Sequence, residues 1–268
     1  MNKIIRVSTV PISLNLLLKG QLKFLNNYFN VLAVSGKGLD LEEVAKREGV
    51  GVFSIEMQRK ISPIQDLISL IQLYFYFRKE RPTIVHSITP KAGLLSMIAA
   101  KLAGVPIRMH TFTGLIFPSK SGVFQKILIL MDRLLCACAT NIYPEGQGVK
   151  KDLISYKITK KALKVIGNGN VNGIDVNCFN PELYDVNNKI EERKKIKISE
   201  NDFVFIFVGR LVKDKGINEL VEAFFRLESN YRNIKLLLVG PFENDLDPLN
   251  NETLEIIKES DNIISVGF

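Results

Sequence analysis

Two cations and two glycines lie close together in the second half of the chain, in the run GRLVKDKG at positions 209–216. Arg210 offers a planar fork of hydrogen-bond donors and Lys215 a compact positive charge, a combination that suits a diphosphate. The run is not an ATP-type phosphate loop, because Lys215 is followed by Gly216 rather than by Ser or Thr. The chemistry of these residues leaves two interpretations open, an anion site and a solvated loop.

The elements on either side of this loop are compatible with an anion site, although many charged loops between a strand and a helix are only solvated. Residues 203–208 are apolar, aromatic and β-branched, which predicts a buried strand. The following residues place Leu220, Val221, Phe224 and Leu227 at helical spacing. The loop therefore joins the carboxyl end of a strand to the start of a helix, the position at which open α/β sheets bind ligands. The free N–H groups of a helix N-terminus also attract anions.

The only two histidines of the chain follow the same pattern. His86 and His110 each lie near the carboxyl end of a predicted strand, at residues 83–88 and 105–111. Each has two interpretations, a contact with a ligand or a structural hydrogen bond. Lys91 opens the helix after Pro90, where it either meets a phosphate of an acceptor or is solvated.

Strands and helices alternate along the whole chain, which predicts an α/β fold with doubly wound parallel sheets. We expect two domains, residues 1–163 and residues 164–268. The expected strands are 4–10, 30–34, 52–56, 83–88, 105–111, 140–143, 203–208, 234–239 and 263–266. The expected helices are 13–25, 39–48, 62–79, 91–104, 123–137, 191–198, 217–230 and 251–260. The helix at 62–79 is expected to begin with a capping box formed by Ser62 and Gln65.

Composition limits the classes of partner. The net charge of +8 and the pI near 9.3 favour an anionic partner. No RNP, zinc-finger or helix-turn-helix pattern is present, so nucleic acid is not the expected partner. The three cysteines have no zinc-site spacing, and neither a metal nor a cofactor is expected. The segment 123–139 is too short and too charged to span a bilayer, whereas the aromatic helix at 62–79 either packs in the core or lies on an anionic membrane.

Three stretches carry a resemblance to a known family: STVPISLNLLLKGQL, TPKAGLLSMIAAKLAGVPIRMHT and FVGRLVKDKGINELVEAF. The chain resembles the retaining, nucleotide-sugar-dependent glycosyltransferases of family 4. Within this family it resembles the subgroup that builds surface polysaccharides or lipid-linked oligosaccharides in bacteria. The resemblance implies a GT-B-like fold with two Rossmann-like domains, the second of them incomplete. The first domain would bind the acceptor and the second the nucleotide sugar.

The resemblance also implies roles for individual residues. Arg210, Lys215 and Gly209 would bind the diphosphate of the donor. His110 would face the donor sugar as a catalytic residue, and His86 and Lys91 are candidates on the acceptor side.

The activity implied is transfer, with retention, of a sugar from a UDP-sugar to an undecaprenyl-diphosphate-linked saccharide in capsule or O-antigen synthesis. An N-acetylhexosamine is one candidate sugar. The enzyme would act in the cytoplasm or at the inner face of the cell membrane, where an anionic surface is a further partner. Relatives also carry an acidic Glu-x7-Glu element after this region, so the resemblance implies that the 268 residues are not a complete enzyme. Two alternatives remain open, a nucleotide-binding fragment without activity and a basic module that binds membranes or RNA.

Overall fold

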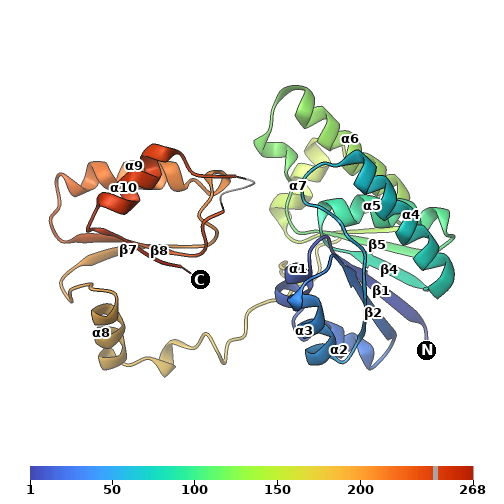
Figure 1. Ribbon diagram of the computed structural model, residues 1–268, viewed down its shortest axis with the longest axis horizontal. Coiled ribbons are helices and arrows are strands. Elements are labelled where there is room, and N and C mark those ends of the chain that lie inside the picture. Colours follow the sequence, from blue (N-terminus) through green and yellow to red (C-terminus); the bar gives the residue numbers. More distant parts are fainter. Residues whose placement is uncertain (244–246, 268) are drawn as a thin grey trace. The chain divides into compact units, whose positions relative to one another are not determined.

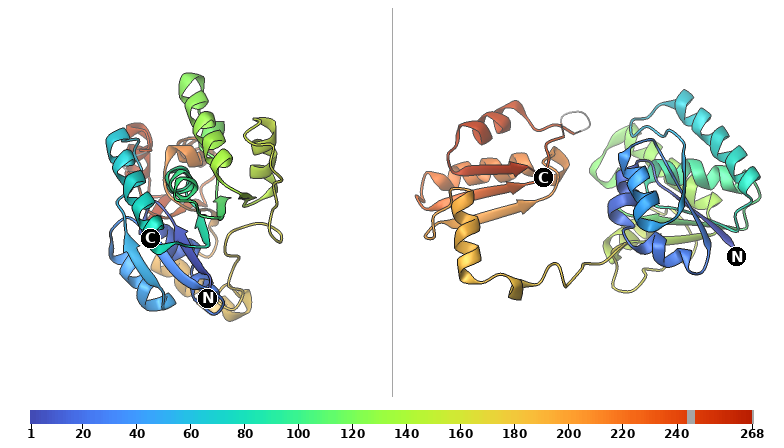
Figure 2. Two further views of the ribbon diagram at one scale, coloured as in Figure 1. Left: turned by 90° about the vertical axis from the view of Figure 1, so that its right-hand side faces the viewer. Right: turned by 60° about the horizontal axis from the view of Figure 1, so that its bottom comes forward.

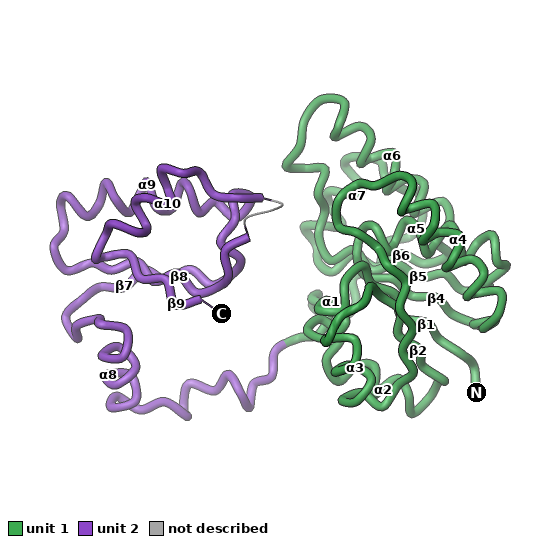
Figure 3. Tube along the Cα trace, in the orientation of Figure 1, with its two compact units in different colours: residues 1–173 green, residues 174–268 purple. Residues whose placement is uncertain are grey.

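The computed structural model describes residues 1–243 and 247–267, and the chain divides into two compact units, residues 1–173 and 174–268 (Figure 3). The expected boundary lay earlier, after residue 163. Three hydrogen bonds tie the intervening segment to unit 1: Asn170 N to Glu145 O (2.6 Å), Gln21 Nε2 to Val171 O (3.3 Å) and Asn172 Nδ2 to Lys19 O (3.1 Å). Phe268, the last residue of the second expected domain, lies outside the described residues.

Unit 1 is built on one sheet of six parallel strands in the order β3-β2-β1-β4-β5-β6. The strands are β1 (Lys3–Val7), β2 (Asn30–Ser35), β3 (Gly51–Ser54), β4 (Ile84–Ser87), β5 (Ile107–Phe112) and β6 (Asn141–Pro144). This is the strand order of a doubly wound dinucleotide-type fold, and each strand lies where the sequence predicts one. All carboxyl ends meet at one edge of the sheet, which is where ligands bind in such folds.

Helices cover both faces of this sheet (Figures 1 and 2). One layer contains α1 (Pro11–Leu17), α2 (Gln21–Asn26) and α3 (Leu39–Glu48). The other contains α4 (Pro63–Glu80), α5 (Pro90–Leu102) and α6 (Gly122–Cys138), and α7 (Gln147–Ser155) follows β6. The 3-10 helix η1 (Phe117–Ser119) precedes α6. Two apolar cores result, one beneath each helical layer, because a strand buried on both faces is apolar on both.

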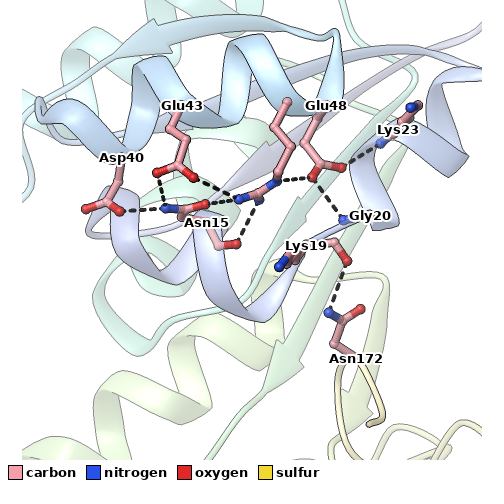
Figure 4. Close-up of polar contacts among 9 residues, drawn as sticks. Asn15, Lys19, Gly20, Lys23, Asp40, Glu43, Glu48 and Asn172 are labelled. Carbon is pink, nitrogen blue, oxygen red and sulfur yellow. Dashed lines mark hydrogen bonds and ion pairs between the residues drawn. The ribbon is translucent and has the colours of Figure 1, made fainter. Parts of the chain in front are cut away.

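A buried carboxylate shapes the first helical layer. The expected helix at 13–25 is two helices, because the chain turns at Gly20, whose φ of 77° is left-handed. Glu48 is buried and accepts the backbone N–H groups of Gly20 (2.9 Å) and Lys23 (3.0 Å), so it caps α2 (Figure 4). Arg47 donates to the same carboxylate from Nε (2.8 Å) and reaches Asn15 O with its Nη2 (2.8 Å). This network joins α1, α2 and α3.

Two further expectations about helices were wrong. No capping box begins α4, since the Ser62 side chain makes no capping hydrogen bond and Asp66 Oδ2 accepts Ser62 N instead (3.3 Å). The expected helix at 191–198 begins earlier, as α8 (Val186–Lys195), because Asp185 and Asn188 form a capping box there. The sequence reading also missed α7.

Unit 2 contains a smaller parallel sheet in the order β7-β8-β9, formed by β7 (Phe203–Val208), β8 (Ile234–Val239) and β9 (Ile263–Gly267). The helices α9 (Ile217–Glu228) and α10 (Asn251–Glu259) pack on this sheet around a core that includes Val221, Phe224 and Leu236. Two 3-10 helices, η2 (Pro181–Leu183) and η3 (Lys213–Lys215), complete the unit. Within residues 1–243 and 247–267, no helix combines the length and apolar content needed to cross a bilayer.

Candidate functional site

Two glycines bring the ends of β7 and β8 into close contact in unit 2. Val208 pairs with Val239, so the two strands end at the same level, and Gly209 and Gly240 follow them. A Cβ atom on Gly240 would lie 1.9 Å from the carbonyl oxygen of Gly209. Only glycine fits there, since this distance is far inside van der Waals contact. The segments that follow the two strands continue side by side, and Leu211 N donates to Pro241 O (2.9 Å).

Arg210 follows Gly209 and lies at the carboxyl edge of this sheet. Its side chain is 54% exposed and forms an ion pair with Glu243. The next two residues, Leu211 and Val212, are buried and anchor the loop. Glu243 is a site residue that sequence reasoning missed, because it lies outside the predicted strands and helices and 33 positions from Arg210. Both strands end in the pair Val-Gly, and this repeated pattern is the sequence feature that could have predicted the position of Glu243 beside Arg210.

Lys215 lies at the other end of the loop, where α9 begins. Residues 213–215 form η3, and Gly216 adopts a left-handed φ of 75° at the N-cap position of α9. Gly216 has no side chain with which to cap the first N–H groups of α9, and the neighbouring Lys215 is exposed. Within the described ranges Lys215 makes no ion pair. The loop thus presents an arginine, a lysine and a helix N-terminus, an arrangement that can bind an anion.

His86 belongs to a buried polar chain in unit 1. Arg6 Nη1 donates to His86 Nδ1 (2.8 Å), so His86 carries its proton on Nε2 and donates it to Thr111 Oγ1 (2.8 Å). Burial, the charge of Arg6 and the proximity of His110 lower the pKa of His86 well below its usual value. His86 is therefore neutral near pH 7. Arg6 is also buried, and burial lowers its pKa to about 10. Its Nε has no hydrogen-bond partner in the described part of the chain.

His110 is buried on the opposite face of the sheet. Its Nδ1 lies 2.8 Å from Ser87 Oγ, and its ring meets Phe112 edge-on at 4.5 Å between centroids. Gly93 of α5 leaves room for the ring, since a Cβ atom there would lie 2.5 Å from His110 Cε1. Burial lowers the pKa of His110 to about 3, which keeps the ring neutral. The residue can offer a hydrogen bond at neutral pH but no positive charge.

The structure separates the two histidines that the sequence placed together. Successive side chains of a strand point to opposite faces. Ser87 pairs with His110, so His86 lies on the other face, with Arg6 and Thr111. The sequence reading recognised neither Arg6 nor Thr111 as a partner of His86. The sequence feature that could have identified Arg6 is its charge, since it lies inside an otherwise apolar strand.

Lys91 is neither solvated nor free. Its Nζ forms an ion pair with Asp66 of α4 (2.7 Å to Oδ1 and 3.0 Å to Oδ2) and also donates to the carbonyl of Lys60. Both side chains are largely buried. Lys91 therefore holds the start of α4 against the start of α5. Among the described residues, no three His, Cys, Asp or Glu lie close enough together to hold a metal ion.

Comparison with known proteins places these features in context. Residues 29–169 match the family model described as glycosyl transferase 4-like domain, and residues 188–265 match that of glycosyl transferases group 1. The capsular polysaccharide biosynthesis glycosyltransferase CapM of Staphylococcus aureus is 37% identical over 245 residues, which cover 91% of this chain and 62% of CapM. An Escherichia coli protein named UDP-Gal:alpha-D-GlcNAc-diphosphoundecaprenol alpha-1,3-galactosyltransferase is 33% identical over 70% of this chain and 48% of its own length.

Solved structures share the architecture. HepE from Anabaena, in complex with UDP and glucose, has a TM-score of 0.72 at 15% identity, over 100% of this chain and 70% of HepE. A glycosyltransferase from Rickettsia africae has a TM-score of 0.66 at 21% identity, over 99% of this chain and 68% of its own. The likeness confirms the predicted α/β, GT-B-like fold. The chain spans less than two thirds of the length of CapM and of the Escherichia coli relative.

Proposed function

The chain belongs to the glycosyl transferase 4-like family, and we propose on that premise that it transfers a sugar from a UDP-sugar to a lipid-linked saccharide. The acceptor we propose is a saccharide on undecaprenyl diphosphate, in the synthesis of a bacterial surface polysaccharide. The names of CapM and of the Escherichia coli galactosyltransferase support this choice. The observation that carries the proposal is the loop with Arg210 and Lys215 between β7 and α9.

The loop suits the most demanding part of the reaction. Negative charge grows on the β-phosphate as the bond between the anomeric carbon and the phosphate oxygen breaks. Arg210 and Lys215 would bind that phosphate and stabilise its charge, and Gly209, which has no side chain, would let the diphosphate approach the backbone. Fixed cations at a developing charge are among the strongest contributions to catalysis. The oxygen of the acceptor hydroxyl forms the new bond to the same carbon as its proton passes to the departing phosphate oxygen, and we propose that the anomeric configuration is retained.

We also propose roles for three residues of unit 1. We place His110 at the donor sugar, where its neutral ring would offer a hydrogen bond rather than a charge. His86 lies near the carboxyl edge, with Arg6 fixing its tautomer, and we place it on the acceptor side. Lys91 would act on that side by holding α4 and α5 together. The donor sugar is proposed to be a hexose or an N-acetylhexosamine, and the enzyme to act at the inner face of the cell membrane.

The direct test is donor binding followed by transfer. Thermal unfolding is recorded with UDP, UDP-glucose, UDP-galactose and UDP-N-acetylglucosamine, since a ligand that binds the native state raises the apparent stability. We expect stabilisation by UDP and by at least one UDP-sugar, and its loss in Arg210→Ala and Lys215→Ala. Transfer to lipid-linked acceptors is then measured with the donor that binds best. Binding without transfer would favour a nucleotide-binding fragment, and salt-sensitive RNA binding that UDP-sugars do not compete with would favour the basic module.

A further inference from the structure

Two helices of unit 1 carry apolar side chains on their exposed sides. On α4 these are Ile64, Ile68, Ile71 and Phe75, and on α6 they are Val123, Ile127, Leu130 and Leu134. Both sets have the spacing i, i+4, i+7, i+11, which aligns four side chains along one side of a helix. We name them the α4 stripe and the α6 stripe. A helix that only covers a sheet is polar on its exposed side, so these stripes need another explanation.

The stripes are separate from the surfaces that hold the helices in place. Leu73 and Phe77 of α4, and Leu135 and Cys136 of α6, are buried in the core of unit 1. α5 packs between the two helices, and the three form one layer on the same face of the sheet (Figures 1 and 2). Core packing is thus complete without the stripes. Their apolar surface is left for a partner outside the unit.

The α6 stripe lies beside the edge of the sheet where ligands bind. A Cβ atom on Gly93, near the start of α5, would lie 2.8 Å from Leu135 of α6. The residues of α6 before Leu135 therefore extend past the start of α5, as Figure 2 shows in its left view. The start of α5 follows the carboxyl end of β4, so the α6 stripe extends beyond this edge of the sheet.

The segment that carries the stripes has an excess of positive charge. Residues 59–133 contain eleven Lys and Arg and three Asp and Glu. Asp66 is paired with Lys91, Glu80 is paired with Lys3, and Asp132 is half-buried. Unit 1 as a whole contains 24 Lys and Arg against 10 Asp and Glu, a formal charge of +14, whereas unit 2 contains 12 against 18, a formal charge of −6. The basic character of the chain therefore belongs to the unit that carries the stripes.

We propose that the α4 and α6 stripes form a docking surface for an anionic lipid bilayer. Apolar side chains that enter the interface, surrounded by Lys and Arg that meet anionic head groups, are the two features that bind a helix to a membrane surface. A second copy of the chain fits less well, because it would bring two strongly positive surfaces together. This docking surface deepens the proposed function and rests on it, because an enzyme whose acceptor is lipid-linked must reach a membrane.

The test is flotation with lipid vesicles. Vesicles of phosphatidylcholine that contain phosphatidylglycerol are compared with vesicles of phosphatidylcholine alone. The double variant Val123→Ser and Leu130→Ser removes two side chains of the α6 stripe that are 74% and 65% exposed. The matched control, Val186→Ser and Leu183→Ser, changes the same residue types in unit 2, where they are 72% and 59% exposed. Far-UV circular dichroism and the melting temperature show that each variant is folded.

We expect the chain to float with the anionic vesicles and far less with the neutral ones, and salt to weaken the binding. The α6 variant should bind the anionic vesicles at least about tenfold more weakly, because two apolar side chains no longer enter the interface. The control should bind as the unaltered chain does. Absence of flotation with anionic vesicles, or equal binding by the α6 variant, would overturn the proposal. Self-association that the α6 variant abolishes, without flotation, would assign the surface to a second copy instead.

The variant Arg210→Ala separates this inference from the proposed function. It should lose UDP binding and still float, because Arg210 belongs to unit 2 and is part of neither stripe. A chain that binds UDP but does not float would refute the docking surface alone. A chain that floats but binds neither UDP nor any UDP-sugar would refute the proposed function alone.

Discussion

The ion pair between Arg210 and Glu243 predicts opposite effects for substitutions of its two members on UDP binding. Arg210 must leave Glu243, or share it, in order to bind a phosphate. Arg210→Ala removes one charge-assisted contact, which is worth about 1.5–3 kcal/mol, so UDP should bind about 10- to 150-fold more weakly. Glu243→Gln removes the competing carboxylate. Because the Arg210 side chain is 54% exposed, solvent screening limits that competition to about 0.2–1 kcal/mol, or up to about fivefold tighter binding.

Isothermal titration calorimetry with UDP measures both effects. The dissociation constant for UDP should be lowest for Glu243→Gln, intermediate for the unaltered chain and highest for Arg210→Ala. The double variant should bind UDP about as Arg210→Ala does, because the competition that Glu243→Gln removes is competition for the arginine. Arg226→Ala is the control, since Arg226 is an exposed arginine of unit 2 that pairs with Glu222 on α9. Unchanged affinity in Arg210→Ala would refute the site. Weaker binding in Glu243→Gln would show that Glu243 positions Arg210 rather than competes for it.

Three further predictions concern unit 1. Glu48→Gln should lower the free energy of unfolding by about 2–4 kcal/mol, because two backbone donors and Arg47 lose their charged acceptor. Glu48 is buried, but its hydrogen bonds with Gly20, Arg47 and Lys23 and the charge of Arg47 outweigh that burial and lower its pKa below 4.5. The difference between variant and unaltered chain in urea titrations should therefore be full above pH 4.5 and shrink below it; a constant difference would contradict this. Gly93→Ala should cost about 1–3 kcal/mol, because its Cβ would meet His110 and Leu135 within 2.8 Å, whereas Gly148→Ala meets nothing within 4 Å and should be neutral or stabilising in the same urea series. His110→Ala should reduce turnover more than UDP affinity in a transfer assay; a lower melting temperature with normal specific activity would support a purely structural histidine.

The periodic apolar pattern of the sequence determined most of the architecture. Parallel strands are continuous apolar runs, and the helices between them have a different period, so their order was visible without coordinates. The prediction that residues 203–208 form a buried strand was wrong in one respect, since β7 is largely exposed. The basic loop between β7 and α9 was likewise visible, because Gly209 and Gly216 bound it and the apolar runs on both sides are long. The break at Gly20 was not visible, since the residues around it have helical spacing and the turn depends on the distant carboxylate of Glu48.

Only the tertiary structure decided which polar residues meet. Arg210 and Glu243 are 33 positions apart, and the parallel register of β7 and β8 brings them together. Lys91 looks like a solvated residue of a first helical turn until α4 packs on α5 and Asp66 reaches it. His86 and His110 share an edge of the sheet but point to opposite faces, because Ser87 rather than His86 pairs with His110. Local patterns determine which elements form, whereas register and packing between distant segments determine which side chains share a site.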